Sequence, residues 1–251
     1  MRKRTQVGCY VVIAALLLLV PSVFAQKQTL RINDPASGTV VDGIYVGSYS
    51  ATGSTGNVQI TCDDFKDESN YNSATYTTNT FSSLGSTIWG STLGVGAATK
   101  LYEEAAWLDV TIANMVKPSG AVVGDYSFAI WAVFDATDVA KWLTKYRDSA
   151  TCNAVFGAGS WTGGACSGKG TGGLLATAAT AVSKLSPANF ANIIILTPTC
   201  KNGPGTCAEQ EFLEIVPEGG SVAMYLLVAG LCCFAALYHR SRRQAGEGNP
   251  V

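Results

Sequence analysis

An apolar run near the C-terminus, residues 222–238, is the sequence feature that most constrains how this chain can fold. It contains no charged residue and no proline, so a helix can satisfy its own backbone hydrogen bonds inside lipid. Its length lies near the lower end of the roughly 17–25 residues that a membrane-spanning helix needs. The basic stop that follows, residues 239–243, contains Arg240, Arg242 and Arg243, which favour the cytoplasmic side. We therefore expect one transmembrane helix, with the preceding chain on the outer side of the membrane.

The first residues of the chain, 1–25, have the pattern of a secretory signal peptide. Basic residues at 2–4 precede an apolar stretch at 7–20, and Ala25 is the last small residue before a cut. We expect signal peptidase to cleave after Ala25. The chain between the two apolar segments, residues 26–215, is then an extracytoplasmic domain in an oxidising compartment.

A short polar motif, residues 216–221, joins this domain to the apolar run. It consists of Val216, Pro217, Glu218, Gly219, Gly220 and Ser221. Pro217 lacks an N–H group and ends any preceding strand, while Gly219 and Gly220 leave the backbone flexible at the membrane surface. A flexible backbone at that depth is accessible to a membrane-embedded protease.

The motif, the span and the arginines together, residues 216–243, resemble the PEP-CTERM sorting signal of Gram-negative bacteria. Gly219 stands where that family usually has a second proline, and the tail continues over 244–251. The resemblance implies an inner-membrane anchor that an exosortase-like membrane protease cleaves near the motif. It further implies delivery to the cell surface or to an exopolysaccharide matrix.

Histidine usage narrows the chemistry open to the domain. His239 is the only histidine of the chain, so residues 26–215 cannot hold a Ser-His-Asp triad, a Cys-His pair or a histidine zinc site. Charged residues are 14% of the chain with a net charge of −1, which gives no electrostatic case for nucleic acid as a partner. We expect no catalytic activity, no cofactor and no metal. A carboxylate-dependent glycosidase remains an alternative, because it needs only two acidic side chains.

Five of the eight cysteines fall in the domain: Cys62, Cys152, Cys166, Cys200 and Cys207. Pairing nearest neighbours gives the disulfide candidates Cys152–Cys166 and Cys200–Cys207, although sequence alone does not determine connectivity. Cys62 is then the unpaired candidate.

Some segments alternate apolar and polar residues, and others have apolar residues at helical spacing. Together they predict an α+β fold, an antiparallel β-rich domain with a central helical block. Strands are expected over 39–49, 58–62, 71–81, 193–196 and 211–215, the last two as a hairpin. Helices are expected over 101–115, 126–134, 139–146 and 175–185.

Three polar or aromatic features have alternative interpretations. Asp63 and Asp64 lack the ligand spacing of a calcium loop, so we expect a solvated turn after a strand. Glu103 and Glu104 point in different directions on a helix, which favours a solvated face over a catalytic pair. Trp161 lies in a glycine-rich loop and is the tryptophan most open to carbohydrate, in a surface adhesin or carbohydrate-binding module.

A second resemblance rests on residues 61–65, Thr-Cys-Asp-Asp-Phe, at a strand end and on Ala129-Ile130-Trp131 in a helix. These residues are similar to those of bacterial thioester adhesin domains. In that family a cysteine and a glutamine form an internal thioester. The glutamine position, two residues before the alanine, is Ser127 here, and at the comparable 105–107 it is Glu103. The resemblance therefore implies a related fold without the reactive bond.

Overall fold

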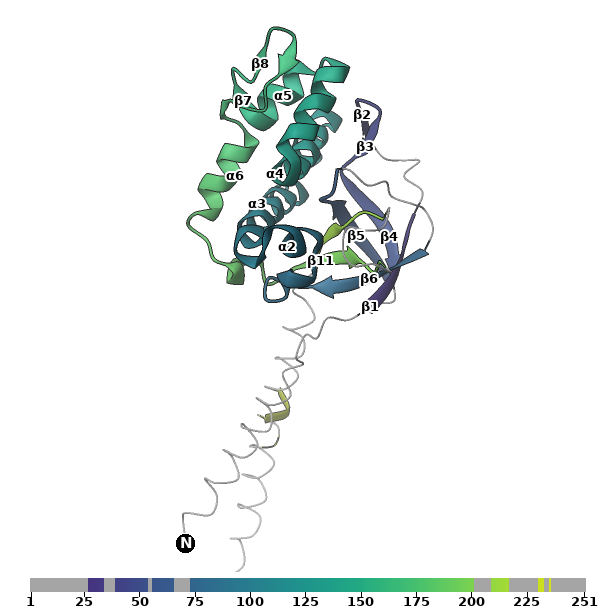
Figure 1. Ribbon diagram of the computed structural model, residues 1–251. Coiled ribbons are helices and arrows are strands. Elements are labelled where there is room, and N and C mark those ends of the chain that lie inside the picture. Colours follow the sequence, from purple (N-terminus) through teal and green to yellow (C-terminus); the bar gives the residue numbers. More distant parts are fainter. Residues whose placement is uncertain are drawn as a thin grey trace, which may run out of the picture.

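The computed structural model describes residues 27–33, 39–53, 56–65, 73–200, 209–216, 230–232 and 235. They form a closed antiparallel β-barrel with a block of helices packed against one side of it (Figure 1). The predicted combination of antiparallel strands and a helical block, an α+β fold, is confirmed.

The barrel is built from strands at both ends of the described chain. Its neighbours, in order, are β1 (Lys27–Ile32), β4 (Ser48–Gly53), β5 (Gly56–Cys62), β12 (Phe212–Ile215), β11 (Ile193–Pro198) and β6 (Ser73–Asn79), and β6 closes onto β1. Alternate residues point inward, as the two-residue period of a strand requires. Leu30, Ile60, Tyr76 and Phe212 are all at most 2% exposed and fill the interior.

The helical block follows β6 and precedes β11. Its helices are α2 (Ile88–Leu93), α3 (Val95–Ala113), α4 (Gly120–Tyr146), α5 (Ser149–Phe156) and α6 (Leu174–Val182), with 3₁₀ turns η1 (Leu84–Ser86) and η2 (Pro187–Phe190). Three small hairpins complete the described elements: β2 (Thr39–Val41) with β3 (Ile44–Val46), β7 (Gly157–Ala158) with β10 (Thr171–Gly172), and β8 (Trp161–Thr162) with β9 (Ala165–Cys166).

The two helices expected at 126–134 and 139–146 both lie within α4, on either side of a break. Asp135 has non-helical angles, φ −140° and ψ 71°, and so interrupts the regular helix. Its carboxylate accepts a hydrogen bond from the backbone N–H of Asp138 at 3.1 Å. Asp135 thus caps the second segment as an N-cap residue does.

The strand predictions agree with the structure in most places. The hairpin of β11 and β12 is present, with Ile195 opposite Leu213. The segment 39–49 was expected to belong to the main sheet, but residues 39–46 form the separate hairpin of β2 and β3 instead. The strand β1 was not predicted, although it pairs with both β4 and β6.

Two expectations about acidic residues are wrong. Asp63 and Asp64 do not form a solvated turn, because both are buried, at 0% and 4% exposure. Glu103 is also buried rather than on a solvated helix face, while Glu104 is half-buried. The physical reason is that the helical block covers the end of β5, and sequence periodicity does not reveal which polar surface another element will cover.

Most of the predicted span at 222–238 lies outside the described residues. Four of its residues are described, and they are helical: Gly230, Leu231, Cys232 and Ala235. Within the described part of the chain, no helix combines the length and apolar character needed to cross a membrane. The signal peptide at 1–25 also lies outside the described residues, so both segments stay predictions.

Candidate functional site

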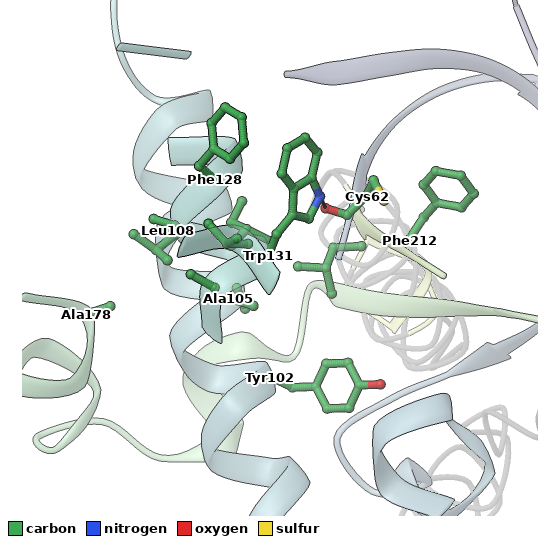
Figure 2. Close-up of a cluster of buried hydrophobic side chains, with 14 of the residues drawn as sticks. Cys62, Tyr102, Ala105, Leu108, Phe128, Trp131, Ala178 and Phe212 are labelled. Atoms are coloured by element: carbon green, nitrogen blue, oxygen red, sulfur yellow. Dashed lines mark hydrogen bonds between the residues drawn. The ribbon is translucent and has the colours of Figure 1, made fainter. Parts of the chain in front are cut away.

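The end of β5 meets helix α4 where the barrel joins the helical block. The indole Nε1 of Trp131 donates a hydrogen bond to the backbone carbonyl of Cys62 at 3.0 Å, as Figure 2 shows. The Phe65 ring packs against the Trp131 ring, with 5.3 Å between centroids. The fold therefore brings together the two sequence segments that resemble thioester adhesins, although 69 residues separate them.

Cys62 carries a free thiol that is 2% exposed. Its Sγ donates to the backbone carbonyl of Asp64 at 2.9 Å. Burial raises the pKa of this thiol well above its usual range, and the carboxylates of Asp63 and Asp64 raise it further. Because the thiolate is the reactive form of cysteine, this environment makes Cys62 a poor nucleophile.

Ser127 stands where the resemblance to thioester adhesins would place the glutamine, and its hydroxyl makes two hydrogen bonds. Its hydroxyl accepts a hydrogen bond from the backbone N–H of Gly47 at 2.8 Å and donates to the carbonyl of Val123 at 3.0 Å. A cavity of about 150 Å³ lies beside it, lined also by Thr61 and Ile130. A serine hydroxyl has no carboxamide to join to a thiol. Through its two hydrogen bonds Ser127 instead ties α4 to the loop before β4.

A chain of hydrogen bonds crosses the same junction. The hydroxyls of Ser48 and Thr61 are 3.2 Å apart, and Thr61 donates to the carboxylate of Asp109 at 2.7 Å. Asp109 lies on α3 and is 2% exposed. Burial raises the pKa of Asp109 to about 6, while the Thr61 hydrogen bond lowers it.

A second buried carboxylate, Glu211, lies just before β12 and is fully buried. Its Oε2 accepts from the backbone N–H of Ile88 at 3.0 Å and from the Thr197 hydroxyl at 2.5 Å. Its Oε1 accepts from the Tyr102 hydroxyl. The three donors come from α2, β11 and α3, so one carboxylate joins the barrel to two helices.

No sequence pattern indicated that Glu211 and Tyr102 would be partners or that Asp109 would be buried. None of the three lies in a recognisable motif, and Tyr102 and Glu211 are 109 residues apart. Such a contact is set by tertiary packing alone.

The disulfide Cys152–Cys166 is present, as predicted, and joins α5 to β9. Cys200 follows β11, but Cys207 lies outside the described residues, so their pairing stays a prediction. Trp161 is half-buried and packs against the hydrophobic core rather than standing free in its loop.

Most residues of the sorting signal also fall outside the described chain. Val216 is described: it is 38% exposed, and its N–H bonds to the Asn192 carbonyl at 2.8 Å. Outside are the predicted cleavage position Ala25, the motif residues Pro217, Glu218, Gly219 and Gly220, and the basic stop Arg240, Arg242 and Arg243.

Within the described residues, no group of three or more His, Cys, Asp or Glu side chains is arranged to hold a metal ion. No protein-family model matches the chain, and no curated protein or solved structure matches it either.

Proposed function

We propose that this chain is an exported envelope or matrix protein, held in the inner membrane by its C-terminal segment and released by an exosortase-like protease. Its domain is displayed rather than catalytic, and its destination is the cell surface or an exopolysaccharide matrix. The sorting signal at 216–243 is the sequence basis of this proposal.

The observation that supports export most directly is the Cys152–Cys166 disulfide. Disulfides form and persist in oxidising compartments and are rare in the bacterial cytosol. The buried, protonated state of Cys62 supports a passive domain, because this thiol is inaccessible to a substrate.

The proposal is tested by the mass of the mature protein. The full chain is expressed in its native host with and without the exosortase-like protease, and the exported form is weighed intact. We expect signal peptidase to remove residues 1–25 in both cases, and residues 222–251 to be absent only when the exosortase-like protease is present. A mature form that retains 222–251 in the complete host would show that the chain is an ordinary anchored protein.

A second candidate, a surface adhesin, is favoured by one contact. The Trp131–Cys62 hydrogen bond joins the two segments whose sequence resembles thioester adhesin domains. Ser127 removes the covalent bond of that family, so an adhesin of this type would bind without a covalent link.

Retention on exopolysaccharide purified from the host tests this candidate. Trp161→Ala should weaken retention, whereas its neighbour variant Thr162→Ala should leave it unchanged, because only the tryptophan offers a large face for stacking on a sugar. Equal retention of both variants and the parent protein would remove Trp161 as a binding residue.

A further inference from the structure

Two buried carboxyl groups lie opposite each other at the junction between barrel and helices. Cys62 is paired with Phe212 at the end of the ladder of β5 and β12. The next residues outward on the two segments are Asp63 and Glu211. The N–H of Asp63 donates to the carbonyl of Glu211 at 3.3 Å, which continues this register. Directly opposed residues on antiparallel strands have Cβ atoms roughly 4.5–5.5 Å apart and share a face. The two carboxyl groups are therefore neighbours.

Both members of the pair are excluded from water, at 0% exposure each. The Glu211 carboxylate has protein donors in place of water, because it accepts hydrogen bonds from Ile88, Thr197 and Tyr102. Asp63 has the opposite environment: within the described chain, neither of its carboxylate oxygens has a hydrogen-bond donor. A buried ionised carboxylate without donors is very costly, whereas a protonated one is itself a donor.

The titratable groups that face the pair are acids as well. Asp64 is adjacent, Cys62 precedes the pair on β5, and Tyr102 reaches it from α3. Burial raises the pKa of Asp63 well above its usual range, followed by the effects of the Glu211 and Asp64 charges. Burial likewise raises the pKa of Glu211 to about 7, although its three donors act in the opposite direction.

We propose that Asp63 and Glu211 form a buried proton-binding pair, in which protonated Asp63 donates to Glu211 and the shared proton holds the helical block against the barrel. Glu211 keeps its bonds to α2, α3 and β11 because it bears the charge. Loss of the proton places two negative charges face to face in a dry junction and loosens the contact of α2 and α3 with the barrel.

The direction of the pH effect follows from proton counts. In the unfolded chain both carboxyl groups are ionised above pH values of about 4 to 5. The folded chain keeps the shared proton to higher pH, so it binds more protons than the unfolded chain. The free energy of unfolding is then greatest in acid and falls as pH rises. For one retained proton, the unfolding constant rises by up to about tenfold per pH unit.

Urea unfolding of the full chain in detergent micelles, followed by tryptophan fluorescence at pH 6, 7 and 8, tests the pair. In the parent protein the unfolding constant should rise with pH. Asp63→Asn supplies a permanent N–H donor to Glu211 without a titrating proton. The unfolding constant of the parent protein should rise by a factor that approaches tenfold per pH unit, and this variant should lack that rise. The variant should also be more stable than the parent protein at pH 8.

Two variants serve as matched controls. Asp138→Asn removes an exposed carboxylate that pairs with Lys141, and should keep the parent slope. Asp109→Asn removes a buried carboxyl with a pKa of about 6, and should keep the slope between pH 7 and 8. The proposal would be overturned if the unfolding constant of Asp63→Asn rose with pH as in the parent protein, or if a control variant lost this rise to the same extent.

Infrared spectroscopy adds a readout that a structural role alone would not change. The parent protein at pH 7 should show the carbonyl stretch of a protonated buried carboxyl group, and Asp63→Asn should lack it. Calcium added at pH 8 should not stabilise the parent protein. Stabilisation by calcium that Asp63→Asn abolishes would identify a cation site instead and overturn the proton-binding pair.

Discussion

At the scale of single residues, two tryptophans of α4 have opposite hydrogen-bonding situations. Trp131 donates to the buried carbonyl of Cys62. Trp142 has a buried Nε1 with no acceptor within the described residues. Both substitutions to phenylalanine remove the same atoms, so Trp142→Phe serves as the control for loss of the Trp131 hydrogen bond.

We expect Trp131→Phe to destabilise the protein by about 1–3 kcal/mol more than Trp142→Phe, because only the first leaves a buried carbonyl without its donor. The free energy of unfolding in urea measures this difference. Equal losses in the two variants would mean that ring volume, and not the indole bond, is what matters at Trp131.

The thiol of Cys62 should be protected from chemical modification in the folded protein. This thiol is buried and its pKa is raised, so an alkylating reagent at pH 8 should modify it far more slowly in the native chain than in concentrated urea. Mass spectrometry of the labelled peptide checks the result. Equal labelling rates in both conditions would show that the end of β5 is open to solvent.

At the scale of elements, the start of the helical block depends on a close backbone approach. A Cβ atom at Gly90, in α2, would lie 1.7 Å from the carbonyl oxygen of Leu84. The N–H of Gly90 also bonds to the Thr87 hydroxyl that caps the helix. This geometry positions Ile88, whose N–H reaches Glu211.

Gly90→Ala should therefore destabilise the protein by about 1–3 kcal/mol, the usual cost of forcing atoms into a packed region. The matched control is Gly96→Ala in α3, where a Cβ would meet nothing within 4 Å. That variant should be neutral or stabilising by up to about 1 kcal/mol, because alanine favours helices more than glycine does. Thermal unfolding of both variants gives the comparison, and a stabilising Gly90→Ala would contradict the close approach.

Elements with strong local patterns could be predicted from sequence. The spacing of Leu101, Ala105 and Leu108 indicated α3, and all of these but Leu101 are fully buried. The expectation that Glu103 lies on a solvated face of this helix was wrong. A helix packed between a barrel and other helices buries more than its apolar stripe, and periodicity alone does not show this.

At the scale of the whole molecule, the Cys152–Cys166 disulfide closes a loop with a sequence separation of 14 residues. The chain-entropy model assigns about 3 kcal/mol to a loop of this size. Reduction should lower the urea midpoint of the parent protein by more than that of the Cys152→Ala/Cys166→Ala variant, which lacks this crosslink and keeps the other cysteines. An unchanged midpoint in reduced protein would show that the crosslink does not restrict the unfolded chain.

The sequence by itself determined the properties that depend on local pattern and residue count: the α+β class, the β11–β12 hairpin and the absence of histidine from residues 26–215. Pairing of nearest neighbours made Cys152–Cys166 a candidate disulfide, and the fold decided it. Only the tertiary structure decided the closure of the barrel and the burial of Asp63 opposite Glu211. The reason is physical. Backbone periodicity is encoded over a few neighbouring residues, whereas the environment of a carboxyl group depends on elements more than a hundred residues away.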